Sequence, residues 1–96
     1  MKRNARKAFK ELQKLGAPVY HRRDEDNCEF ILGAELRSND DSYFADYYRE
    51  ELREYVDANG KIQNPFGIRT DVNDIIEANG LMAEWINGGM VGVYQQ

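Results

Sequence analysis

Cysteine, histidine, proline and long apolar runs are all scarce in this chain. It has 96 residues, with one Cys, one His and two Pro. A single Cys excludes a disulfide framework and any zinc site built on several thiolates, and it suits a reducing compartment. The longest apolar runs are three or four residues, so we expect neither a membrane span nor a basic-then-apolar leader before the domain. These absences predict a soluble, cytoplasmic protein.

The length allows one globular domain, which we expect to span residues 1–96. Leu, Ile, Val and Phe account for 21 residues, above the level of roughly 20% below which chains tend to stay disordered. No motif in the sequence identifies a known family. Function must therefore be argued from the patterns of charge and hydrophobicity.

Charge is distributed unevenly along the chain. Residues 1–23 contain eight basic side chains and one acidic one, whereas residues 24–58 contain twelve acidic and three basic ones. Residues 59–96 contain four acidic and two basic side chains, and the whole chain has a formal net charge of −4. A bipolar arrangement of this kind bears on partners and association rather than on fold.

Hydrophobic periodicity and turn residues predict the element order α-β-β-α-α-β-β. The expected elements are a helix at 2–15, a hairpin of strands 18–22 and 28–35, a helix at 43–58, a loop at 61–69, a helix at 71–79, and a hairpin of strands 81–86 and 90–94. The plan helix, glycine, hairpin occurs twice, around Gly16 and Gly80. We therefore expect the two hairpins to join into one four-stranded antiparallel sheet, covered by helices in a two-layer α+β domain.

The apolar faces of these elements predict one shared core. Its expected members are Phe9, Leu12, Val19, Phe30, Leu32, Leu52, Ile75, Ile76 and Val93. The loop 61–69 contains Ile62, Phe66 and Ile68, which are too apolar for a wholly exposed connection. We expect Phe66 to fill the core. If Phe66 is exposed instead, this loop becomes a candidate binding surface.

His21 and Cys28 are the only pair that could form a nucleophile and its base. A hairpin turn centred on Asp24-Glu25 would set them opposite each other, whereas a turn at Asp26-Asn27 would separate them. The acidic stretch 24–27 lacks the ligand spacing, central Gly and distal Glu of a calcium loop. We therefore expect no catalytic residue, no metal and no cofactor.

The first predicted helix has a basic face. Its members, with two arginines that follow in the first hairpin, are Arg3, Arg6, Lys7, Lys10, Lys14, Arg22 and Arg23. These side chains could contact phosphates, but the face lacks the aromatic and amide side chains that read bases. The rest of the chain is acidic and would repel a polyanion at long range. Nucleic-acid binding is thus the alternative function.

The predicted helix at 43–58 has an acidic side edged by tyrosines. Together with two acids just upstream, the candidate partner-binding residues are Asp40, Asp41, Tyr43, Asp46, Tyr47, Glu50, Glu51, Glu54 and Asp57. Carboxylates steer a basic partner, and Tyr offers a large rigid contact area with a polar tip. The competing interpretation is a solvated face whose acids form surface ion pairs with Arg49 and Arg53.

These patterns favour a non-enzymatic protein-binding module over an enzyme. We expect a small acidic inhibitor whose ridge occupies a basic surface of a partner protein, such as a nucleic-acid-processing complex. By analogy of size and charge alone, phage counter-defence proteins of the anti-CRISPR or anti-restriction type are the class to test first. The sequence leaves a homodimer open.

Overall fold

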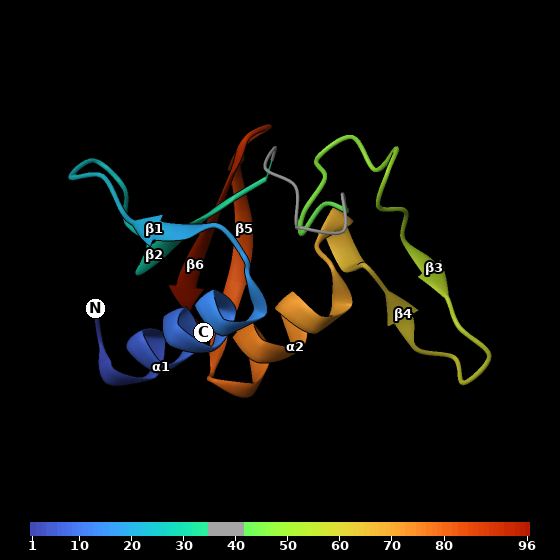
Figure 1. Cartoon of the computed structure of the whole chain (residues 1–96), viewed down its shortest axis with the longest axis horizontal. Coiled ribbons are helices and arrows are strands. Elements are labelled where there is room, and N and C mark those ends of the chain that lie inside the picture. The colour runs from blue at the N-terminus through green and yellow to red at the C-terminus, as the bar shows by residue number, and fades with distance from the viewer. Residues whose placement is uncertain (35–41) are drawn as a thin grey trace.

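The computed structural model describes residues 1–34 and 42–96, which form a two-layer α+β fold. The elements are α1 (Arg3–Leu15), β1 (Val19–His21), β2 (Phe30–Gly33), β3 (Tyr55–Val56), β4 (Ile62–Gln63), the 3-10 turn η1 (Pro65–Gly67), α2 (Thr70–Ala78), β5 (Leu81–Asn87) and β6 (Met90–Gln95). The main sheet has the strand order β1-β2-β6-β5, and β3 and β4 form a separate hairpin. Figure 1 shows α1 and α2 together beside the sheet, with the β3–β4 hairpin set apart from it.

The predicted joining of the two hairpins is confirmed. Every neighbouring pair in the main sheet is antiparallel, and β2 pairs with β6 at the centre, with Phe30 opposite Val93. Each of the helices α1 and α2 is followed by a glycine in the left-handed conformation, Gly16 and Gly80. Glycine adopts this conformation without steric penalty, so the chain can leave each helix and turn directly into a hairpin.

The core lies between the helices and one face of the sheet. Ala5, Ala8 and Leu12 of α1 are fully buried there, as the apolar stripe at 2–15 predicts. Both hairpins share this core, which confirms the predicted arrangement. Of the expected members, Leu12, Phe30, Leu32, Ile76 and Val93 are buried in the core, and Phe9, Val19 and Ile75 pack against it. Leu52 is not among the core residues, so that part of the prediction is wrong.

The prediction of a helix at 43–58 is also wrong. Residues 44–46 instead pair with residues 67–69: Arg69 N–H donates to the Phe44 carbonyl, and Asp46 N–H donates to the Gly67 carbonyl. Ala45 forms an antiparallel bridge with Ile68 between these two bonds. Helix propensity is a weak preference that tertiary pairing overrides, and here the pairing buries Phe44, Ala45 and Ile68.

The loop at 61–69 contains β4 and a tight turn. Gly67 N–H donates to the Asn64 carbonyl at 3.1 Å, which confirms the turn that Asn64-Pro65-Phe66-Gly67 predicts. Ile68 is buried, whereas Ile62 and Phe66 are exposed. The expectation that Phe66 fills the core is therefore wrong, because the bridge to Ala45 turns Ile68 inward instead.

Neither helix in the described part of the chain has the length and hydrophobicity needed to cross a membrane. This finding agrees with the short apolar runs of the sequence.

Substitution of Gly67 should test the pairing of residues 44–46 with 67–69. A Cβ added to Gly67 would overlap the Asp46 carbonyl oxygen, whereas a Cβ on Gly60 would meet nothing within 4 Å. Both glycines have positive φ, of +76° and +81°. We expect Gly60→Ala to lower the free energy of unfolding by about 1–2 kcal/mol, the penalty for a left-handed L-residue. Gly67→Ala should lower it clearly further in urea titrations, and equal losses would contradict the pairing.

Candidate functional site

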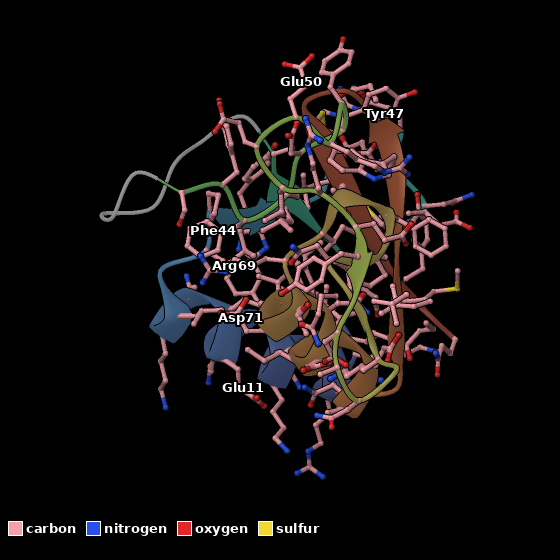
Figure 2. All side chains as sticks on the ribbon, turned by 90° about the vertical axis from the view of Figure 1, so that its right-hand side faces the viewer. Glu11, Phe44, Tyr47, Glu50, Arg69 and Asp71 are labelled. Atoms are coloured by element: carbon pink, nitrogen blue, oxygen red, sulfur yellow. The ribbon has the colours of Figure 1, made fainter. Side chains whose placement is uncertain are left out.

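Five of the six predicted residues within segment 42–54 gather around one hollow, although no helix forms there. The hollow has a volume of about 260 Å³ and adjoins the turn between β5 and β6. Its lining residues are Ala34, Tyr43, Asp46, Tyr47, Tyr48, Glu50, Glu51 and Gly88. Figure 2 shows Tyr47 and Glu50 together at the upper end of the molecule, beside the β5–β6 hairpin. Five of the nine predicted partner-binding residues are thus brought together.

The other four predicted residues do not line this hollow. Asp40 and Asp41 lie outside the described residues. Glu54 accepts a hydrogen bond from Phe66 N–H at 3.4 Å. Asp57 lies at the β3–β4 turn, where it accepts from Lys61 N–H at 2.9 Å and from the Gln63 amide at 2.8 Å. The Lys61 N–H bond is the largest of the effects that lower the pKa of Asp57. Asp57 therefore holds a turn.

Asp46 positions the loop that carries the exposed side chains. Its carboxylate accepts from the backbone N–H of Tyr48 at 3.2 Å, of Glu51 at 2.8 Å and of Leu52 at 3.3 Å. An aspartate side chain that takes up local amides competes with helical hydrogen bonding, which is a second reason why 43–58 is not a helix. The same bonds fix Tyr47 and Glu50 on the outside of the loop.

Three aromatic rings form a continuous stack beside the hollow. The ring centroid of Tyr47 lies 5.3 Å from those of Tyr48 and Trp85, and both contacts are edge-to-face. Tyr47 and Tyr48 remain 47% and 71% exposed. Edge-to-face pairs stabilise a fixed ring arrangement, so these side chains offer a rigid apolar surface to solvent. The sequence pattern did not single out Trp85 as part of this site.

Phe66 is the most unusual residue near this stack. It is 66% exposed and has a φ of +58°, a conformation that costs a non-glycine residue about 1–2 kcal/mol. Trp85 Nε1–H donates to the Phe66 carbonyl at 2.8 Å, and the Glu54 carboxylate accepts from Phe66 N–H. Both backbone groups are therefore held by side chains. A strained residue that is held in place and exposes its ring is typical of functional sites.

A second hollow connects Phe66 to the sheet. Its volume is about 400 Å³, and its lining residues are Phe66, Met82, Ala83, Glu84 and Trp85. Because Trp85 lines this hollow and contacts Tyr47 of the first, the two hollows adjoin. We call the combined surface the aromatic–acidic face, and its members are Tyr47, Tyr48, Phe66 and Trp85 with Glu50, Glu51, Glu54 and Glu84.

The glutamates of this face lack direct ion-pair partners among the described residues. Within residues 1–34 and 42–96, no ion pair involves Glu50, Glu51 or Glu84. The surface pairs with Arg49 and Arg53 that the sequence allows do not form among the described residues. The aromatic rings are therefore surrounded by carboxylates whose charge is available to a partner.

The basic face of α1 lies away from this surface. Figure 2 places Glu11 of α1 at the lower end of the molecule, opposite Tyr47 and Glu50. The five basic residues predicted on α1 are all exposed, namely Arg3, Arg6, Lys7, Lys10 and Lys14. Arg22 and Arg23 both donate to Asp26 in the first hairpin loop, and Arg22 also lines a hollow with Lys2.

The geometry does not pair His21 with Cys28. His21 lies opposite Phe30 in the β1–β2 register and stacks on Phe9 at a centroid distance of 5.5 Å. Cys28 is buried, and burial raises the pKa of its thiol, which disfavours the nucleophilic thiolate. In the described part of the chain, no cluster of three or more His, Cys, Asp or Glu could hold a metal ion.

Comparisons with known protein families, with curated proteins and with solved structures found no match to this chain. A function for this protein must therefore be inferred from the geometry of its own surface.

Replacement of Phe66 should show that its ring contributes little to folding. We expect Phe66→Ala to change the free energy of unfolding by less than about 1 kcal/mol, because the ring is exposed. Phe66→Gly should be more stable than Phe66→Ala by up to about 1 kcal/mol, since glycine removes the left-handed strain. Urea titrations of both variants measure these values. A loss of about 3–5 kcal/mol in Phe66→Ala would instead indicate a buried ring.

Proposed function

We propose that this protein is a non-enzymatic binding module whose aromatic–acidic face occupies a basic surface of a partner protein. The observation that supports this most directly is the exposed pair Tyr47 and Tyr48, held against half-buried Trp85, beside glutamates that form no ion pair among the described residues. Exposed apolar patches bordered by polar groups mark interaction sites. Tyr and Trp are also the residues that most often dominate binding energy at protein interfaces.

The charge of the face favours a basic partner. Carboxylates around an apolar centre attract a positive surface and raise the rate of association. A positive surface large enough to meet this face is typical of proteins that bind nucleic acid, where Lys and Arg contact phosphates. The proposed mechanism is inhibition, in which the glutamates take the place of the phosphates. Phage counter-defence proteins, by analogy alone, remain the first class to test.

Variants of the aromatic–acidic face should distinguish residues that raise the association rate from residues that lower the dissociation rate. In surface-binding kinetics against the partner that co-purifies with the tagged protein, Glu50→Lys with Glu51→Lys should lower the association rate about tenfold and flatten its salt dependence. Tyr47→Ala should act mainly on the dissociation rate and raise it at least about fivefold, because aromatic anchors lie at the desolvated centre of an interface.

The matched control is Asp24→Lys with Glu77→Lys, which changes the net charge by the same amount away from the face. Both of these acids are exposed. The control should leave the dissociation rate unchanged and affect association only weakly. Equal effects from both double variants would mean that net charge alone governs binding, and the proposal would then be wrong.

The alternative function is nucleic-acid binding by α1. The observation in its favour is that the five basic side chains of α1 are exposed and form no ion pair among the described residues. If this function holds, the protein should be retained on immobilised DNA at low salt. Replacement of Arg3, Arg6, Lys7 and Lys10 by Gln should then abolish retention, and the face variants should not.

A further inference from the structure

Strand β5 is an open edge of the main sheet. It pairs only with β6, and within residues 1–34 and 42–96 no backbone hydrogen bond joins it to another segment. Gln96 N–H donates to the Gly80 carbonyl, which sets the alternation of the ladder. Met82 and Glu84 follow at intervals of two and direct their backbone groups to β6. The N–H and C=O groups of Ala83 and Trp85 therefore point to the open side.

This edge has few of the features that usually protect edge strands, and the one it has is a β-bulge between Trp85 and Asn87, at the end of the strand. Such strands are commonly short, or carry proline or several charged residues. The opposite edge, β1, has three residues, whereas β5 has seven. Strand β5 has no proline, and Glu84 is its only charged residue. Its backbone is therefore suited to pairing with another extended chain.

The hollow at this edge is lined by different side chains on the two faces of β5. Side chains alternate along a strand, so Ala83 and Trp85 lie on the core side of β5, near Phe66. Met82 and Glu84 lie on the other side. An added strand would thus set every second side chain against Phe66 and Trp85, and the side chains between them beside Met82 and Glu84.

We propose that the partner supplies an extended segment that pairs with β5 as a fifth strand of the sheet. Alternate residues of this segment are apolar and fit against Phe66 and Trp85. The residues between them are basic and face Glu84. This inference rests on the proposed function and specifies how the partner is bound, namely by strand addition beside the aromatic anchors.

Charge distinguishes this occupant from a second copy of the chain. Glu84 is the central residue of β5. Antiparallel pairing of two β5 strands about their centre would place Glu84 opposite Glu84 of the other copy, and like charges directly opposite each other destabilise a strand pair. The chain also has a net charge of −4, which adds to the repulsion. A basic segment meets neither obstacle.

The experiment uses a capped ten-residue peptide of alternating Val and Lys, titrated into the whole protein by calorimetry and amide NMR. The chain variant is Ala83→Pro, which removes an N–H on the open side and leaves the ladder to β6 intact; Ala83→Ser is its matched control. We expect Ala83→Pro to weaken binding by about fivefold to tenfold, as the loss of one backbone hydrogen bond predicts. Ala83→Ser should bind within about twofold of wild type. A far-UV spectrum of Ala83→Pro checks that the sheet persists.

Modified peptides test the chemistry of the occupant. One peptide is N-methylated at its odd-numbered amides and a second at its even-numbered amides. The peptide whose methylated amides face β5 should not bind, because N-methylation blocks the backbone hydrogen bonds without changing the side chains. Replacement of Lys by Glu should also abolish binding. Equal affinity of the parent peptide and both N-methylated forms would overturn strand addition, and so would unchanged binding by Ala83→Pro.

Partner binding by the variants distinguishes an error in strand addition from an error in the proposed function. If Ala83→Pro binds the co-purified partner normally while Glu50→Lys with Glu51→Lys does not, strand addition is wrong and the binding face remains. If neither variant affects partner binding, both proposals fail. A dimer in light scattering that Ala83→Pro dissociates would assign the β5 edge to a second copy and overturn the proposed occupant.

Discussion

The pairing of residues 44–46 with residues 67–69 is the constraint on which the rest of the surface depends. Two backbone hydrogen bonds and one bridge join these segments, and they bury Phe44 and Ile68. The Arg69 guanidinium lies over the Phe44 ring, 4.3 Å from its centroid, and Figure 2 shows these two residues next to each other. Everything between the two segments is then excluded from the core. Tyr47, Tyr48 and Phe66 lie in the chain between the two paired segments, and their side chains are exposed.

The sequence predicts the parts of the fold whose signals are local. The apolar stripe of α1 repeats at helical spacing, and Gly16 and the turn residues Asn87 to Gly89 end one element and start the next within a few residues. The joining of the hairpins follows because each has one apolar face. The segment 43–58 has helical spacing as well, but Phe44 and Asp46 make backbone bonds with Arg69 and Gly67, more than twenty positions away. Local periodicity contains no information on that competition.

The residues of the candidate site also fall into those that local sequence signals predict and those that they do not. The grouping of Tyr43, Tyr47 and Glu50 survives the loss of the predicted helix, because residues a few positions apart stay close in any compact loop. Phe66 and Trp85 could not be found by pattern. Their contact is a hydrogen bond between residues nineteen positions apart, and it depends on a positive φ at Phe66 that its sequence does not favour. The sequence signal near Phe66 is the apolar content of loop 61–69. It indicates that a large side chain of this loop either enters the core or forms part of a binding surface.

The separation of charge in space bears on the choice between the two functions. In Figure 2, α1 lies in the lower part of the molecule, with Glu11, and Glu50 lies at the top, and no ion pair joins α1 to the aromatic–acidic face among the described residues. A polyanion at α1 would still experience the repulsion of the acidic end at low salt, and α1 has no exposed aromatic side chain to add apolar contact. A basic protein at the other end gains both from the carboxylates and from burial of Tyr47, Tyr48 and Phe66, which salt does not screen. The contribution from burial is what would let an interface of modest charge persist at physiological ionic strength, and Tyr47, Tyr48 and Phe66 supply it beside the carboxylates.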